Sequence, residues 1–117
     1  MKKQFRVKKS SDFKKILDYK KIAGRNASFV IYYHHNILNY GRVGISVSKK
    51  LANAVYRSKI RRQVRAMINK TDILTKSNDL VIIIKEGYIK LTFQENLNNL
   101  IAILSKMDGE KKIEKTK

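Results

Sequence analysis

The chain has 117 residues and a net charge of +18, with 27 lysines and arginines against nine acids. One domain of this length buries roughly two-thirds of its surface, and such a charge calls for a polyanionic partner, either nucleic acid or an anionic membrane. The sequence has no cysteine and no long apolar run, which excludes disulfides, thiolate catalysis, cysteine-ligated zinc and a membrane-spanning helix. Residues 1–13 lack the apolar core of a secretory signal, so we expect a cytoplasmic protein.

The first expected elements are a basic arm, a helix and a strand. Residues 1–9 form the arm, which we expect to be flexible, and Ser10 or Ser11 can cap the helix that follows. The apolar face of this helix has the spacing i, i+3, i+4 and consists of Phe13, Ile16 and Leu17. Residues 28–33 (SFVIYY) predict a strand with Phe29, Ile31 and Tyr33 on one face and Val30 and Tyr32 on the other.

Residues 42–48 (RVGISVS) alternate in polarity and predict a second strand, whose core face consists of Val43, Ile45 and Val47. The opposite face is small and polar, so another group can lie flat on it. If the two strands pair, Val30 and Tyr32 share that face, and Lys49 and Lys50 stand at its end. Aromatic and basic groups on an open sheet suit single-stranded nucleic acid. The alternative is that Tyr32 is a half-buried structural residue.

The second half of the chain predicts a helix, a strand and a final helix. Residues 53–69 form the first helix, with Asn53 as its cap. Residues 80–84 (LVIII) suit a strand that is covered on both faces. Thr92 and Glu95 form a capping box for the last helix, whose expected buried face is Leu97, Leu100, Ile101 and Leu104. Residues 106–117 should fray into a charged tail, with 108–117 flexible.

The helix expected at residues 53–69 separates into an apolar stripe and a cationic edge. The stripe, expected to pack on the sheet, consists of Tyr56, Ile60, Val64, Met67 and Ile68. Arg57, Arg61 and Arg65 recur at i, i+4, i+8 beside it, and no acid occurs between Asp18 and Asp72. A charged helix face is often merely solvated, but this one lacks acidic partners and prefers arginine, whose planar fork suits phosphate. The edge therefore predicts a polyanion-binding surface.

No pattern predicts catalysis by the chain itself. His34 and His35 are adjacent, so in a strand they point to opposite faces and cannot chelate one metal ion. The sequence contains neither a paired-carboxylate motif nor a glycine-rich phosphate loop. We expect a binding protein that holds no metal or other cofactor.

Two consecutive motifs resemble a known family. RVGISVSKK (42–50) followed by ANAVYRSKIRRQVR (52–65) is similar to the protein subunit of bacterial ribonuclease P, and DFKKIL and FVIY precede them in the family's order. The resemblance covers about residues 5–105. The chain departs from the family pattern at Ser58, where the family usually has Asn, at Ala52 for Gly, at Leu17 for a second aromatic residue, and at 85–87, where the last strand ends.

The resemblance implies a single α+β domain over residues 1–117. Its expected architecture is a two-layer α/β sandwich with the order α-β-β-β-α-β-α, similar to domain 2 of ribosomal protein S5. The four-stranded sheet should contain a left-handed βαβ crossover, against the usual handedness. The fourth strand should come from residues 20–26.

The resemblance also implies a ribonucleoprotein endonuclease that removes the 5′ leader from precursor tRNA. The catalyst is then the RNA subunit, using Mg²⁺, and the protein alone should not cleave. Its partners would be ribonuclease P RNA and precursor tRNA, with no membrane and no obligate protein partner. The alternative is a ribosomal or rRNA-binding protein.

Each expected role falls on positions that match the family's motifs. The residues expected to bind the catalytic RNA are Arg57, Ser58, Lys59, Arg61, Arg62 and Arg65. The residues expected to bind the leader are Phe13, Leu17, Val30, Tyr32, Lys49 and Lys50.

Overall fold

The computed structural model describes residues 3–7 and 10–116, with side chains as far as residue 107. Four strands form one sheet, namely β1 (Ile22–Arg25), β2 (Phe29–His35), β3 (Arg42–Ser46) and β4 (Asn78–Ile84). The α-helices are α1 (Ser10–Asp18), α2 (Ala54–Asn69), α3 (Gly87–Lys90) and α4 (Phe93–Thr116), and the 3₁₀ turns are η1 (Lys3–Phe5) and η2 (Ile73–Thr75). This is the expected order with a short helix, α3, added, and β1 is the fourth strand expected within residues 20–26.

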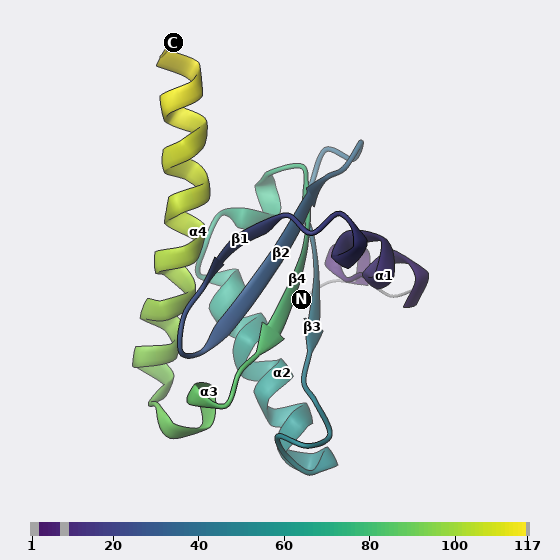
Figure 1. The fold of residues 1–117 in the computed structure, drawn as a ribbon, viewed down its shortest axis with the longest axis vertical. Helices are drawn as coiled ribbons and strands as arrows, with labels where there is room; N and C mark the ends of the chain where they lie inside the picture. Colours follow the sequence, from purple (N-terminus) through teal and green to yellow (C-terminus); the bar gives the residue numbers. More distant parts are fainter. Residues whose placement is uncertain (1–2, 8–9, 117) are drawn as a thin grey trace.

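The strands lie in the order β1-β2-β4-β3. β2 pairs antiparallel with both β1 and β4, and β3 pairs parallel with β4. In Figure 1, α2 and α4 lie behind the sheet and α1 lies on the opposite face. The β3-α2-β4 connection moves from the edge strand inward with its helix behind the sheet, which makes it left-handed. The expected α+β architecture and crossover are therefore confirmed.

The sheet has a full core on one face and a smaller one on the other. α2 and α4 cover Phe29, Ile31, Val43 and other side chains of the first core, where Ile60, Val64, Met67 and Ile68 of α2 are fully buried. Across the sheet, Val81 packs with Val7 and Ile16. β4 is thus covered on both faces, as its continuous apolar run predicts.

Two of the three predicted helix caps are confirmed, and a cap of α1 at Ser10 or Ser11 stays a prediction, since α1 begins at Ser10 and, among the described residues, no cap bond is seen there. The Asn53 side-chain oxygen accepts a hydrogen bond from the Tyr56 amide over 2.9 Å. Thr92 Oγ1 accepts from the Glu95 amide at 3.1 Å, and Glu95 Oε1 accepts from the Thr92 amide at 3.0 Å. These reciprocal bonds satisfy amides that the first helical turn leaves without partners.

Two residues placed in the core were assigned wrongly. Tyr56 is 38% exposed, because the first turn of α2 projects past the end of the sheet (Figure 1). Ile101 is 41% exposed, whereas Ile103 and Met107 are buried. The buried face of α4 is centred on Leu100, and a step of about 100° per residue carries Ile101 to its rim.

The N-terminal arm is tied to the sheet where the structure describes it. Arg6 forms a parallel bridge with Val43, and the Val7 amide donates to the Val43 carbonyl oxygen over 3.1 Å. Residues 1–2 and 8–9 of the expected arm lie outside the described residues. At the other end, α4 continues to Thr116, so its backbone is helical past the point where fraying was expected. The flexibility of 1–9 and 108–117 stays a prediction.

Candidate nucleic-acid interface

The first candidate surface is a row of cations along α2, here called the arginine ridge and defined as Arg57, Lys59, Arg61, Arg62 and Arg65. The guanidinium groups of Arg57, Arg61 and Arg65 belong to half-buried side chains, whereas Lys59 and Arg62 are exposed. Arg57 Nη1 donates to the carbonyl oxygen of Ala52 over 2.9 Å, which fixes the start of the ridge against the turn before α2. Ser58 is exposed between the cations.

Arg65 is a half-buried member of the arginine ridge whose surroundings disfavour its charge. Burial lowers the pKa of its guanidinium, and the nearby charges of Arg6 and Arg61 lower that pKa further. Its Nε atom is buried without a hydrogen-bond partner. Among the residues that the structure describes, no acid pairs with any member of the ridge. An anion at this place would relieve the repulsion between the guanidinium groups.

The second candidate surface is the face of the sheet opposite α2, here called the sheet cleft and defined as Phe13, Leu17, Val30, Tyr32 and Ile83. The strand register places Val30 beside Ile83 and Tyr32 beside Val81 on this face. Phe13, Leu17, Tyr32 and Ile83 are partly buried against the core of Val7, Ile16 and Val81. The four apolar residues expected to bind the leader therefore lie together. Tyr32 is half-buried, which agrees with the leader-binding role and equally with the alternative that it is a structural residue.

Phe13 lies on the face of β3 that carries Gly44 and Ser46, which the sequence predicted to be small and polar. Gly44 is buried, and a Cβ added to it would collide with the Phe13 ring. The glycine thus lets an aromatic ring of α1 approach the backbone of β3 closely. The group that lies flat on this part of the sheet is α1 itself. Beyond it, Ser46 remains exposed beside Ile83.

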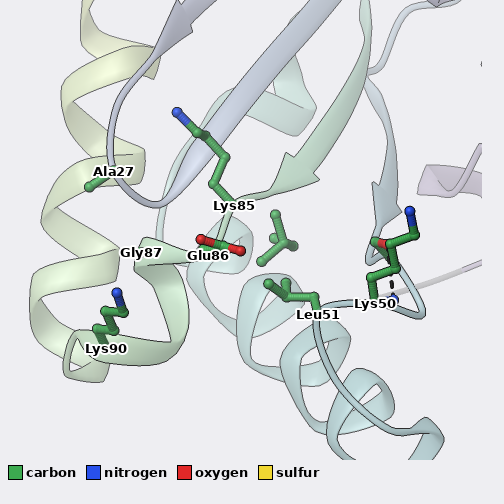
Figure 2. Close-up of a pocket in the computed structure, with 9 residues that line it drawn as sticks. Ala27, Lys50, Leu51, Lys85, Glu86, Gly87 and Lys90 are labelled. Carbon is green, nitrogen blue, oxygen red and sulfur yellow. Dashed lines mark hydrogen bonds between the residues drawn. The ribbon is translucent and has the colours of Figure 1, made fainter.

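A third feature opens where β3 and β4 end. It is a cavity of about 590 Å³, here called the lysine notch, which is lined by Ala27, Ser48, Lys50, Leu51, Ile84, Lys85, Glu86, Gly87 and Lys90. In Figure 2, Lys50 lies at one edge of the notch in the turn after β3, Lys85 and Lys90 lie before and at the end of α3, and Glu86 and Leu51 lie between them. Lys49 is exposed in the same turn as Lys50. The notch thus brings three lysines and Glu86 together at the end of β3 and β4.

The sequence did not identify Lys85 and Lys90 as site residues. Lys85 follows a strand and Lys90 lies four residues after Glu86, and lysines in such positions are usually solvated surface residues. Nor did the sequence identify Arg25, an exposed β1 residue that pairs with Val30. The register of β1 was needed to place that cation beside the sheet cleft.

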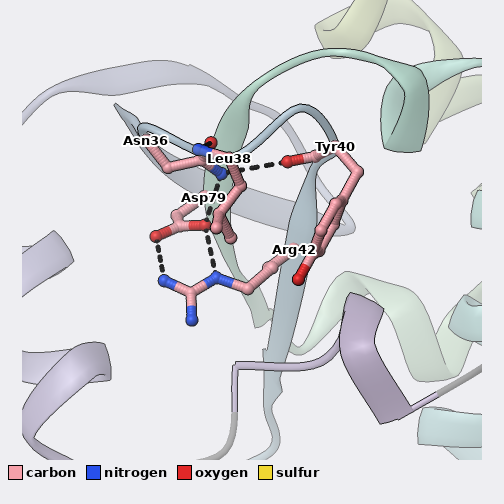
Figure 3. A network of polar contacts seen from close by, with 5 residues as sticks. All are labelled: Asn36, Leu38, Tyr40, Arg42 and Asp79. Atoms are coloured by element: carbon pink, nitrogen blue, oxygen red, sulfur yellow. Dashed lines mark hydrogen bonds and ion pairs between the residues drawn. The ribbon is translucent and has the colours of Figure 1, made fainter.

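One cation on the sheet-cleft face is neutralised (Figure 3). Arg42 Nε and Nη2 donate to the two carboxylate oxygens of Asp79 at 2.9 and 2.6 Å, and Asn36 Nδ2 donates to Asp79 Oδ1 at 2.9 Å. The hydrogen bonds to Asp79 raise the pKa of the Arg42 guanidinium. This network fixes the end of the sheet and leaves Arg42 little capacity for a ligand.

The described residues offer neither a metal site nor a membrane span. They include no group of three or more His, Asp or Glu residues placed to hold a metal ion. His34 stacks on Tyr19 with ring centroids 3.9 Å apart, and His35 is exposed on the other side of β2. None of the described helices combines the length and apolar character needed to cross a membrane.

Comparison with known proteins gives a consistent result. A family model described as Ribonuclease P matches residues 1–108. "Ribonuclease P protein component" of Streptococcus pneumoniae is 43% identical over 105 residues, covering 89% of this chain and 85% of the relative. The protein of the same name from Mycoplasma mycoides subsp. mycoides is 37% identical over 103 residues, covering 86% and 94%.

Solved structures agree with the sequence comparisons. The RNase P protein of Staphylococcus aureus matches with a TM-score of 0.76 and 36% identity, covering 86% of this chain and 93% of that one. The RNase P protein of Thermotoga maritima matches with a TM-score of 0.75 and 28% identity, covering 85% and 94%.

Proposed function

Because the chain belongs to the ribonuclease P protein family, we propose that it binds the catalytic RNA through the arginine ridge and the 5′ leader of precursor tRNA through the sheet cleft and lysine notch. The family gives it a role as the protein component of a tRNA-processing ribonucleoprotein, with ribonuclease P RNA as its partner. The contacts of individual residues with RNA, the removal of the 5′ leader and the location of the protein in the cytoplasm are our proposals.

The observation that carries the proposal is the unpaired charge of the arginine ridge. Five cations lie on one helix, and among the described residues no acid offsets them. Half-buried guanidinium groups hold a fixed orientation, and a fork of N–H donors matches phosphate oxygens bidentately. Each phosphate neutralised in this way releases counterions, which drives binding at low salt.

The sheet cleft suits an extended single strand. Val30, Ile83 and Tyr32 offer an apolar floor on which bases can stack, and Phe13 borders it from α1. The lysine notch would then take the backbone phosphates at the strand's end. Because the ridge and the cleft lie on different faces of the sheet, the two RNAs can be held at once.

Catalysis is assigned to the RNA. The described residues provide no cluster of carboxylates of the kind that holds Mg²⁺, and a surrounding charge of +18 disfavours a divalent cation. We therefore propose that the RNA subunit binds the Mg²⁺ used in catalysis. The protein would raise the affinity for the precursor and lower the Mg²⁺ concentration that the RNA needs.

A processing assay tests the role. A transcribed Staphylococcus aureus ribonuclease P RNA and a precursor tRNA are incubated at low Mg²⁺ with and without the protein. We expect cleavage at the 5′ end of the mature tRNA when both RNA and protein are present. Cleavage by protein freed of RNA would refute RNA catalysis. Co-purification with ribosomal particles, without stimulation of cleavage, would favour the rRNA-binding alternative.

Binding measurements test the two surfaces separately. Arg61→Gln should weaken binding to the catalytic RNA and reduce the slope of log affinity against log salt by about 1. Lys106→Gln removes the same charge from an exposed site on α4 and should change neither. Lys50→Gln should weaken binding of a precursor more than binding of the leaderless tRNA. Equal losses for both substrates would refute the leader assignment.

A further inference from the structure

Residues 6 and 7 reach both faces of the sheet from the free edge of β3. Arg6 bridges Val43, and the Val7 amide bonds the Val43 carbonyl oxygen. Neighbouring residues of an extended segment point to opposite faces. Val7 is 5% exposed and packs with Ile16 of α1 and Val81. Arg6 is therefore directed to the face that carries α2.

On that face, Arg6 joins the arginine ridge. Its charge acts on Arg65 together with that of Arg61, which is one helical turn away. Arg65 Nε is buried without a hydrogen-bond partner. Charges from two segments more than fifty residues apart thus act on Arg65 together, and among the described residues no acid pairs with Arg61 or Arg65. Such an arrangement stores repulsion that a phosphate group would remove.

We propose that Arg6 completes a phosphate site with Arg61 and Arg65, and that RNA bound there holds α1 in place over the opposite face of the sheet. The inference rests on the proposed function, since the phosphate is one of the catalytic RNA. It extends that function by linking the RNA-binding face to the leader-binding face.

The link runs through adjacent residues. A phosphate that binds Arg6 favours the docked position of residues 6–7 on β3. Docking keeps Val7 beneath α1, and α1 begins at Ser10, so the helix can move only a short distance while Val7 is held. α1 carries Phe13 and Leu17 of the sheet cleft. Coupling between binding sites is reciprocal, so a bound leader should tighten binding of the catalytic RNA by the same factor, on the order of fivefold or more.

The first arm of the test measures affinity for transcribed Staphylococcus aureus ribonuclease P RNA over a range of salt. Arg6→Gln should weaken binding and lower the salt slope by about 1. Lys3→Gln is the matched control, because it removes the same charge from the same segment at an exposed residue of η1. Equal effects of the two substitutions would overturn the site, since they would indicate a general charge effect.

The second arm measures amide hydrogen exchange in α1 with and without that RNA. In the wild type and in Lys3→Gln, RNA should slow exchange in α1 at least severalfold, although α1 lies across the sheet from the ridge. In Arg6→Gln, this protection should be lost. A loss of affinity with unchanged protection of α1 would overturn the coupling.

Circular dichroism establishes that each variant is folded, and Arg6→Lys replaces Arg6→Gln if the latter unfolds. Arg6→Lys keeps the charge but lacks the fork, so it should show an intermediate loss of affinity. If the wild type does not bind the RNA, the proposed function itself fails. If the wild type binds and Arg6→Gln matches it in affinity, salt slope and α1 exchange, this inference alone fails.

Discussion

Replacing Gly44 by alanine should destabilise the protein through a collision with Phe13. An added Cβ would overlap the far edge of the Phe13 ring, and even the third-nearest ring atom would be 3.1 Å away. Gly44 is buried in the middle of β3, beside Val81 of β4, so the backbone cannot retreat. The ring must lift and take α1 with it.

The magnitude follows from two opposing effects. Overpacking a tight contact costs about 1–3 kcal/mol. Alanine is better than glycine in a strand interior by about 0.5–1 kcal/mol. We therefore expect Gly44→Ala to lower the free energy of unfolding by up to about 2.5 kcal/mol. In a Phe13→Leu background the ring is gone, so the same substitution should become neutral or slightly stabilising.

Urea denaturation of the four proteins of this double-mutant cycle measures the coupling energy. We expect Gly44 and Phe13 to be coupled by about 1–3 kcal/mol. Gly24→Ala is the control, because its Cβ would meet the Ile103 side chain of α4 instead, at 3.1 Å. Gly24 and Phe13 should be additive. Additivity of Gly44→Ala and Phe13→Leu within about 0.5 kcal/mol would refute the reasoning.

Three further predictions concern stability. Burial raises the pKa of Tyr88 to about 12, whereas the pKa of tyrosine in the unfolded state is near 10. Between pH 10 and 12 the unfolded state therefore loses a proton that the folded state keeps, and the free energy of unfolding should fall by up to about 2–3 kcal/mol. Urea denaturation should show this loss in the wild type and not in Tyr88→Phe. Asn96 is 2% exposed and donates a hydrogen bond to the Tyr88 carbonyl oxygen. In thermal denaturation, Asn96→Ala should therefore lower the free energy of unfolding by about 1–3 kcal/mol, whereas Asn98→Ala, at an exposed residue of the same helix, should lower it little. Arg42→Ala leaves the Asp79 carboxylate without its guanidinium and should lower the free energy of unfolding by about 2–4 kcal/mol. Arg42→Lys keeps the charge and should lower it less. Equal losses for the two variants would contradict a role for the ion pair.

Local patterns predicted much of the fold. Alternation in residues 42–46 separated Val43 from Gly44, because successive side chains of a strand point to opposite faces. The Asn53 cap and the capping box at Thr92 were readable because they depend on residues three positions apart. The core face of α2 followed from helical periodicity. Each of these features is decided within a few residues along the chain.

Features that depend on distant segments escaped the sequence. Arg6 reads as part of a basic arm, and only the bridge to Val43 places it on the face of α2, where its charge acts on Arg65. Lys85 and Lys90 acquire a shared cavity with Lys50 because β3 and β4 run parallel and end together. No periodicity encodes that convergence. The left-handed crossover was available through family resemblance alone, since the usual handedness rule predicts the opposite.

The placement of acids gives the charge pattern a physical reason. Asp79 is buried in the sheet and paired with Arg42, so it neutralises a cation that already has a structural task. The arginine ridge receives no such partner among the described residues. A protein arranged in this way gives up stability as a free chain, because like charges repel along α2. A polyanion that binds the folded state and not the unfolded state restores that stability by mass action. The unpaired ridge is therefore better explained as half of an interface than as a solvated helix face.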